Sequence, residues 1–270
     1  VASLTAQRNL TNTQGTLGTS LQRLSSGLRV NSAKDDAAGM FSIERMTADI
    51  RGLNQAVRNA QDGISLAQTG EGSMSQIQSA LQRIREIAVQ SSNATVEDRT
   101  GLQAEVDQLT QEISRIVTTT EFNGNTLLDG GTASLTFQIG ADGAASNQIS
   151  VTGIDLTAMN SYSGTLTATS VVNVSNATAA SAAIADIDAD IDDVSAERAT
   201  FGAVQNRFEA VIVNLTTYAE NLTSARGRLQ DADFAAETAN LTRAQILQQA
   251  GVAMLAQANT LPQSALALLR

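Results

Sequence analysis

The chain has 270 residues, of which 42% are hydrophobic, so it is long enough and apolar enough to bury a core. Aromatic residues make up only 3% of it and Trp is absent, so burial must come from aliphatic side chains in thin layers, which favours slender helical bundles. The formal net charge of -10 argues against nucleic acid as a partner, and the absence of Cys and His removes disulfides, thiolate chemistry, the usual transition-metal ligands and the commonest general base.

Hydrophobic spacing in the first segment predicts one helix over residues 1 to about 28. Its leucines follow the alternation of three and four residues that lines one side of a helix: Leu10, Leu17, Leu21, Leu24 and Leu28. Turn-forming and charged residues between Asn31 and Gly39 then break the pattern, so we expect a connection there.

The next apolar seam runs from Ile43 to Ala88, is interrupted only at Glu71, and predicts a long helix. Thr95 with Asp98 resembles a capping box, which would open another helix with an apolar seam over residues 102–116. A short connection makes these two helices antiparallel neighbours.

Between Phe122 and about Ser181 the periodicity changes to the alternation of a strand, with Gly and Asn between the apolar residues. The alternating residues are Leu135, Phe137, Ile139, Ile149 and Val151. We expect a small β-rich region with a β-hairpin over about residues 121–150. The stretch near residues 165 to 183, rich in Ala, Ser, Thr and Val, also fits an exposed loop.

Helical spacing resumes at Ile184 and predicts a second long helix that continues to Leu229. After a charged break at residues 231–233, the last segment places large apolar residues at heptad intervals, each preceded by a small residue three positions earlier. The large residues are Leu247, Met254, Leu261 and Leu268, and the small ones are Ala244, Gly251, Ala258 and Ala265. A row of large residues beside a row of small ones lets another helix approach closely.

Each terminal segment therefore carries an apolar stripe that it is too narrow to bury alone. We expect the two stripes to pair with each other and then with copies from neighbouring molecules. A repeating contact that does not close into a ring generates an open helical assembly. The predicted fold is mainly α: a long antiparallel helical coiled-coil bundle with a small β-hairpin region and paired N- and C-terminal helices.

Both ends of the chain resemble bacterial flagellins of the short type. The resemblance rests on LQRLSSGLRVNSAKDDAAGM from Leu21 to Met40 and on DADFAAETANLTRAQILQQAGVAMLAQANTLPQSALALLR from Asp231 to Arg270. It implies a non-enzymatic structural subunit that polymerises through its terminal helices into the flagellar filament for swimming motility, outside the cell. It also implies a terminal inner-tube domain of residues 1–31 and 232–270, an α-rich rod domain of residues 32–231, and a short variable exposed segment at about 130–183.

The same resemblance implies a set of partners. They are other copies of the chain, a flagellar export chaperone, the cap and hook–filament junction proteins, and the flagellar type III apparatus as the export route. No membrane insertion is expected, because no apolar run approaches the roughly 18 residues that a spanning helix needs.

One surface motif carries over from the family residue by residue. The segment LQRIREIAVQSSNAT from Leu81 to Thr95, with QAEV at residues 103–106, resembles the flagellin surface that an animal Toll-like receptor senses. Arg83, Ile87 and Glu105 match its central contact positions, and Ile87 replaces the more usual Leu, which should weaken binding without abolishing it. Plain packing between subunits explains the same residues, and we take that role as the primary one.

We expect no catalytic, cofactor or metal site. The acidic run at residues 186–193 lacks the ligand spacing and the Gly of a calcium loop, and acids that favour a helix N-terminus explain it more simply. The only Lys, Lys34, lies among turn residues. The rival interpretation is a cell-surface paralogue that binds polysaccharide, but residues 130–183 offer only Phe137 and Tyr162 as aromatic faces.

Overall fold

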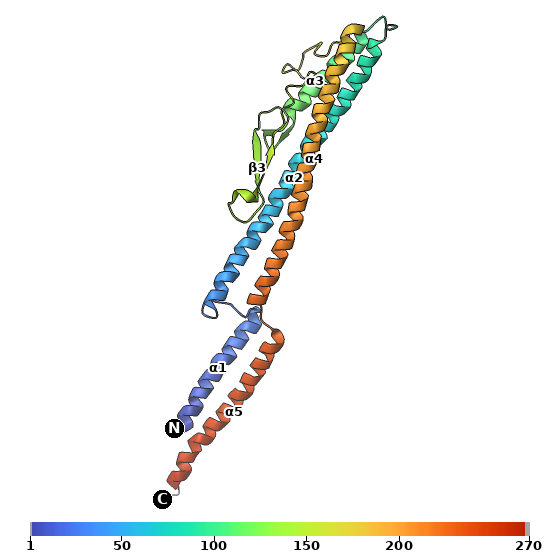
Figure 1. Ribbon diagram of the computed structural model, residues 1–270. Coiled ribbons are helices and arrows are strands. Elements are labelled where there is room, and N and C mark those ends of the chain that lie inside the picture. The colour runs from blue at the N-terminus through green and yellow to red at the C-terminus, as the bar shows by residue number, and fades with distance from the viewer. Residues whose placement is uncertain (1, 268–270) are drawn as a thin grey trace. The chain divides into compact units, whose positions relative to one another are not determined.

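The computed structural model describes the backbone of residues 2–267 and the side chains of residues 3–257. This part of the chain is mainly helical, as predicted, and two small antiparallel sheets lie between the third and fourth helices (Figure 1). The helices are α1 (Ala2–Ser26), α2 (Ala37–Ser92), α3 (Thr100–Thr119), α4 (Ala177–Gln230) and α5 (Phe234–Ala267).

The chain divides into two compact units. Unit 1 comprises Val1–Ile50 with Ala219–Arg270, and unit 2 comprises Arg51–Tyr218. The domain division predicted from the family resemblance remains a prediction.

Unit 1 contains α1, α5, the two linkers that join them to α2 and α4, the first part of α2 and the last part of α4. Gly27, with a φ of 74°, ends α1 and donates its backbone N–H to the carbonyl of Arg23. The linkers then hydrogen-bond to each other, because Arg29 N donates to Gln230 O at 2.6 Å and Ala232 N donates to Gly27 O at 2.9 Å. The two terminal segments are therefore tied together at the point where α1 ends and α5 begins.

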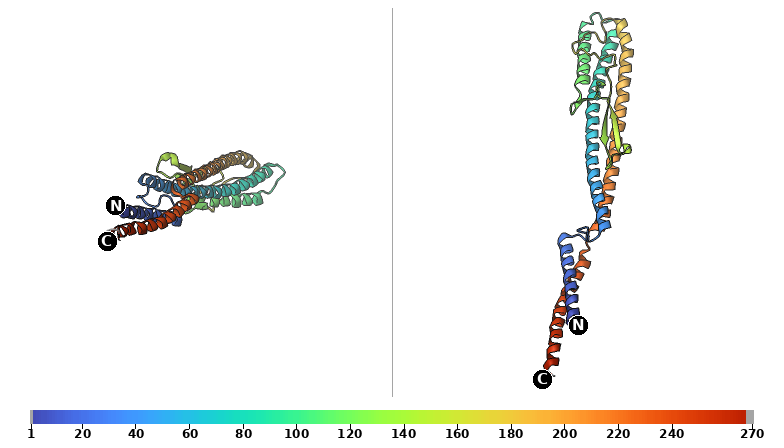
Figure 2. Two further views of the ribbon diagram at one scale, coloured as in Figure 1. Left: turned by 90° about the horizontal axis from the view of Figure 1, so that it is seen from below. Right: turned by 90° about the vertical axis from the view of Figure 1, so that its left-hand side faces the viewer.

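Unit 2 is built around the side-by-side packing of α2 and α4, which both views of Figure 2 show, with α3 against them (Figure 2). The seam predicted for α2 is the core: it includes Met74, Ile77, Leu81 and Ile84, all 0% exposed. Aliphatic side chains supply most of this core, in agreement with the low aromatic content.

Two phenylalanines of α4 fill gaps over glycines of α2. A Cβ added at Gly63 would lie 2.5 Å from Phe208 Cζ, and one added at Gly70 would lie 2.7 Å from Phe201 Cε1. Both rings are almost fully buried, and Phe208 also meets Phe137 edge to face, with ring centroids 5.5 Å apart. The absence of a side chain at each glycine is what lets the helices approach here.

The β region consists of two hairpins. In the first, β1 (Glu121–Phe122) pairs with β2 (Asn125–Thr126) across Asn123 and Gly124, which both have positive φ as a tight Asn-Gly turn requires. In the second, β3 (Ser134–Gln138) pairs with β4 (Gln148–Thr152), with Leu135 opposite Val151 and Phe137 opposite Ile149. The alternating apolar residues of the sequence thus lie on one face of this hairpin, and that face packs against the helices.

Two helix starts differ from the prediction. Helix α3 begins at Thr100, because Asp98 accepts hydrogen bonds from Thr100 N and Thr100 Oγ1, so the capping box expected at Thr95 is wrong. Helix α4 begins at Ala177, well before Ile184, because the Asn176 side chain accepts from Ala179 N at 2.8 Å and an Ala-rich first turn follows. Small residues form this turn without apolar periodicity, so the seam could not reveal it.

Candidate functional site

The first candidate surface is the helix pair of unit 1, α1 and α5, which lie side by side (Figure 1). They approach closely where the sequence alternates large and small residues. Leu10 Cδ1 lies 3.3 Å from the position that a Cβ would take at Gly251, so the leucine packs directly on the glycine. Gly251 belongs to the row of small residues predicted to admit a neighbouring helix.

This pair has almost no hydrophobic core of its own. Among the described side chains of α1 and α5, the buried ones are Ser20, Glu237 and Ala244, which are small or polar. In unit 2, by contrast, large aliphatic side chains are fully covered. The apolar stripes of the terminal helices are thus only partly hidden by packing against each other.

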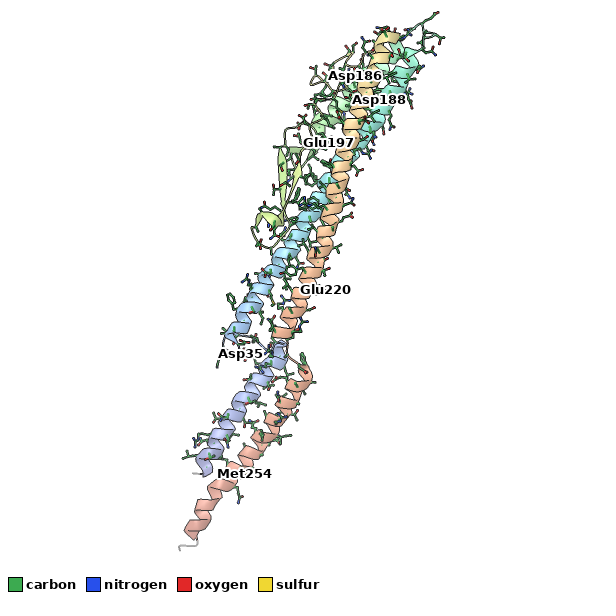
Figure 3. The ribbon with its side chains drawn as sticks, in the orientation of Figure 1. Asp35, Asp186, Asp188, Glu197, Glu220 and Met254 are labelled. Atoms are coloured by element: carbon green, nitrogen blue, oxygen red, sulfur yellow. The ribbon has the colours of Figure 1, made fainter. Side chains whose placement is uncertain are left out.

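The predicted polymerisation seam is largely accessible. Leu21 is 50% exposed, Leu247 is 52% exposed and Met254, labelled in Figure 3, is 64% exposed. Leu10, Leu17, Leu24 and Leu28 are half-buried. The side chain of Leu261 and the whole of Leu268 lie outside the described residues.

An open groove of about 500 Å³ runs along the pair, with Leu10, Leu247 and Met254 among its lining residues. Threonines of α1, of which Thr13 lines the groove, add to the apolar character of this surface. Their hydroxyls donate to backbone carbonyls one turn earlier, so the side-chain methyl groups are what remains to contact a neighbour. These threonines are Thr11, Thr13, Thr16 and Thr19.

At the end of the pair near the linkers, a charged contact replaces apolar packing. Glu237, in the first turn of α5, is 8% exposed and lies 3.7 Å from Arg23 of α1. Asp233 caps the same helix by accepting from the backbone N–H groups of Ala235 and Ala236. These contacts fix where α5 starts relative to α1.

The second candidate surface lies on α2 and α3 in unit 2, where the receptor motif was predicted. Arg83 donates to Glu105 at 2.8 Å and to Glu86 at 3.0 Å, so the structure brings Arg83 and Glu105 together. The hydrogen bonds that the Arg83 guanidinium donates, first to Glu105 and then to Glu86, raise its pKa above its usual range. Ile87 is 0% exposed and supports this surface from the core side.

An open groove of about 700 Å³ adjoins the same surface between α2 and α3. Arg83, Leu109, Arg115 and Ile116 are among its lining residues. Arg115 is paired with Glu112 one turn earlier, at 2.6 Å. The groove therefore offers apolar patches framed by cations that already have partners.

The acidic run in α4 has roles that the sequence did not reveal. Asp190 is 1% exposed and accepts four hydrogen bonds, from the backbone and side chain of both Asn160 and Ser161, at 2.6–3.0 Å. Asp188, which Figure 3 shows near Asp186, pairs with Arg85 at 2.5 Å. The run lies inside α4 and not at its N-terminus, so the helix-dipole explanation given for it is wrong. Residues 3–257 contain no group of three acidic side chains that could hold a metal ion.

Other positioning residues were also missed. Arg99 donates to the carbonyls of Ser91 and Asn93 and so satisfies the C-terminal end of α2. The Gln103 side chain pairs with both Val172 O and Val174 N, which fixes the extended segment before α4 on the surface of α3. Such roles depend on which backbone groups a polar side chain reaches in the folded chain, and sequence spacing does not report this.

Within the described residues, no helix is both long enough and apolar enough to cross a membrane.

Comparisons with known proteins match both ends of the chain. Residues 1–133 match the family model of the bacterial flagellin N-terminal helical region, and residues 184–269 match that of the C-terminal helical region. Flagellin of Halalkalibacterium halodurans is 47% identical over 252 residues, covering 93% of this chain and 90% of that protein. The flagellar filament 33 kDa core protein of Treponema phagedenis is 40% identical over 292 residues, covering 100% and 98%.

The fold agrees with these matches. The crystal structure of Bacillus cereus flagellin is 31% identical in sequence and superimposes with a TM-score of 0.51, covering 63% of this chain and 94% of that one. Sequence at both ends, relatives matched over nearly their whole length, and the helical architecture all agree. The chain belongs to the bacterial flagellin family.

Proposed function

We propose that this chain is the structural subunit of a bacterial flagellar filament and that it polymerises through α1 and α5 to serve swimming motility. The observation that carries the proposal is the exposed apolar surface of the terminal helix pair. Leu21, Leu247 and Met254 are each at least half exposed on helices whose buried residues are small or polar.

Covering such side chains stabilises an assembly by roughly 25 cal/mol per Å² of apolar surface. Two helices already in contact with each other need further helices to cover what remains, and copies of the same chain supply them. A contact that repeats from copy to copy without closing into a ring gives an open helical polymer. Such a filament lies outside the cell.

The test replaces two exposed apolar residues and follows polymerisation. In the variant Leu247→Gln/Met254→Gln, the monomer should keep its helical content, since both side chains face solvent. Seeded filament growth, followed by light scattering and electron microscopy, should need a critical concentration at least about tenfold higher, since about 1 kcal/mol of burial is lost per side chain.

Leu166→Gln is the matched control, because Leu166 is 45% exposed but lies in the segment before α4. It should polymerise like the unmodified chain. Normal growth of the double variant beside a normal control would refute the role of the terminal helices.

Assembly outside the cell requires export, and we propose the flagellar type III apparatus as the route. A chain without Cys forms no disulfide that would hold it folded before passage. The proposed accessory partners are an export chaperone that covers α5 before assembly, together with the cap and hook–filament junction proteins. A chaperone complex that protects residues 234–257 from amide exchange would support this assignment, and protection confined to unit 2 would oppose it.

A host Toll-like receptor is a further proposed partner of the α2–α3 surface. Arg83 and Glu105 supply an exposed pair there, while Ile87 acts only by supporting the helix beneath it. Arg83→Ala should reduce receptor signalling in a reporter cell line, whereas Arg115→Ala, in another exposed arginine pair on α3, should have less effect. Equal signalling from both variants and the unmodified chain would remove this partner.

Nothing observed favours the polysaccharide-binding alternative. The ring of Phe137 packs edge to face on Phe208, and Tyr162 packs against the core of unit 2. Their faces are therefore engaged in folding and not presented to a sugar.

A further inference from the structure

The sulfur of this chain is carried by five methionines, because Cys is absent. Peroxides oxidise methionine at its thioether sulfur, and the accessible sulfur atoms react first. Met74 and Met159 are buried in unit 2, at 0% and 5% exposed. Met40 and Met46 are half-buried. Met254 is 64% exposed on α5, where Figure 3 labels it, so it is the methionine that an oxidant in solution reaches most readily.

Met254 also lines the groove between α1 and α5 on which the proposed polymerisation depends. Leu10 is another lining residue and packs on Gly251, one turn before Met254 on the same helix. A helix of a neighbouring copy that fills this groove covers the Met254 side chain. The most accessible methionine of the single chain is therefore one whose side chain becomes buried when copies assemble.

Oxidation changes this side chain from apolar to polar. Hydrogen peroxide transfers one oxygen atom to the thioether sulfur: a sulfur–oxygen bond forms, the oxygen–oxygen bond of the peroxide breaks, the sulfur is oxidised by two electrons, and the peroxide is reduced to water. The product, methionine sulfoxide, carries an oxygen that accepts hydrogen bonds. In the single chain water supplies the donors for this oxygen, because the side chain is exposed.

The groove supplies few donors once a neighbouring helix excludes water from it. The α5 residues that line it have no side-chain donor; they are Leu247, Ala250, Gly251 and Met254 itself. On α1, the Thr13 hydroxyl already donates to Asn9 O at 2.8 Å. Leaving a buried acceptor without a donor lowers an association constant by about tenfold or more, so the sulfoxide oxygen should oppose packing here.

We propose that Met254 is a site of reversible oxidation in the unassembled chain and that its sulfoxide blocks polymerisation. This proposal rests on the filament function proposed above, because the groove matters only if copies pack on it. Since an added copy covers Met254, chains already assembled are protected, and oxidant stops the addition of chains without dismantling existing filament. Methionine sulfoxide reductases, one for each sulfoxide epimer, restore the thioether and with it the ability to assemble.

The first measurement is the order in which the methionines react. The unassembled full-length chain is treated with hydrogen peroxide at neutral pH, and the sulfoxide at each methionine is quantified over time by peptide mapping and mass spectrometry. Met254 should react at least about tenfold faster than Met74 and Met159, which the core covers. In filaments grown before the treatment, Met254 should react about tenfold more slowly than in the single chain, because a neighbouring copy covers it.

The second measurement is seeded filament growth by chains in which Met254 is oxidised. Their critical concentration should be at least about tenfold higher than that of the untreated chain, and methionine sulfoxide reductases of both epimer specificities should restore it. Met254→Leu is the matched variant: it keeps a similar volume and apolar character, so it should polymerise normally and its growth should not respond to peroxide. Met46→Leu removes a half-buried methionine instead, and its growth should remain sensitive.

Three results would overturn the inference. If Met254 is oxidised and growth is unchanged, the sulfoxide oxygen finds a donor in the assembled groove, such as the exposed Asn9 amide. If Met40 or Met46 reacts before Met254, exposure does not select the site. If peroxide still stops the growth of Met254→Leu, or the reductases restore Met254 without restoring growth, the damage lies elsewhere. The reductase treatment needs no substitution, so it decides the question even if Met254→Leu itself grows poorly.

The polymerisation test of Leu247→Gln/Met254→Gln separates this inference from the proposed function. If that variant grows poorly while the oxidised chain grows normally, the terminal helices carry polymerisation and only the oxidation site is wrong. If both grow normally, the role of the terminal helices falls as well.

Discussion

For the glycines of α2 that lie under phenylalanine rings, we predict that Gly→Ala destabilises the protein, although the same substitution usually stabilises a helix. In a helix interior, Gly→Ala stabilises by about 1 kcal/mol because alanine has the higher helix propensity. Gly63 and Gly72 both lie inside α2. At Gly72 no heavy atom lies within 4 Å of an added Cβ, so Gly72→Ala should show this full gain.

At Gly63 the added methyl group would meet the Phe208 ring at 2.5 and 2.8 Å, below any normal contact distance. The ring cannot move away easily, because it is 0% exposed and Phe137 packs against it. Overpacking of this kind costs about 1–3 kcal/mol, which exceeds the propensity gain, so Gly63→Ala should destabilise by about 1–2 kcal/mol.

The assay is thermal and urea unfolding of the monomeric chain, followed by circular dichroism. For a unit of this size, 1 kcal/mol corresponds to a shift of about 2–4 °C in melting temperature, so the two variants should differ by several degrees in opposite directions. Phe208→Leu should reverse the sign of the Gly63→Ala effect, because the smaller side chain leaves room for the methyl group. If Gly63→Ala and Gly72→Ala stabilise equally, the proposed fit of ring on glycine is wrong.

Three other predictions concern single polar residues. Asp190→Ala should destabilise unit 2 by about 3–5 kcal/mol and release the backbone amides of residues 160 and 161 to hydrogen exchange, and unchanged exchange there would contradict its role. Hydrogen bonds from the side chain and then the backbone of Thr100 hold the pKa of Asp98 below its usual 3.8, so the stability that Asp98 adds over Asn should be present above that pH and disappear as the pH falls through the lowered pKa. Urea titrations of Asp98→Asn at several pH values check this, and a difference that persists in strong acid would refute it. Arg99→Ala should cost about 1–2 kcal/mol and increase proteolysis of residues 93–99, since the carbonyls of Ser91, at the end of α2, and of Asn93, just after it, each lose the hydrogen bond from Arg99; an unchanged cleavage rate would argue against this cap.

Sequence spacing was sufficient for the long helices because their seams are long and regular. Most of the residues predicted along α2, from Ile43 to Ala88, are buried, although Met46, Val57 and Ile64 are only half-buried, and the interruption noted at Glu71 is a partly exposed residue paired with Arg198. The alternating strand residues form one hairpin, as expected. Periodicity shows on which face of a helix or strand a residue lies, and in unit 2 the apolar face is the one that is buried.

Features that depend on contacts between distant residues could not be read in this way. An aspartate in the acidic run looks the same whether it faces solvent, as a helix-terminal acid does, or accepts four hydrogen bonds from residues thirty positions earlier, as Asp190 does. The start of α4 was placed too late because alanines carry no periodic signal. Arg83 and Glu105 are close because α2 and α3 are antiparallel, whereas the burial of Ile87 beneath them follows from its position on the seam.

The terminal helices show why burial and not periodicity alone decides function. Their heptad pattern is as regular as that of α2, yet among the side chains of α1 and α5 that the structure describes, the buried ones are Ser20, Glu237 and Ala244. When a helix carries a regular apolar stripe that its own chain leaves exposed, the stripe is suited to packing in a larger helical bundle than one molecule forms. Since the stripe on α5 combines large residues with Gly251, where Leu10 already fits, further helices of the same type can pack with equally close approach. The additional helices that complete this bundle are, in the function proposed here, the ends of neighbouring copies.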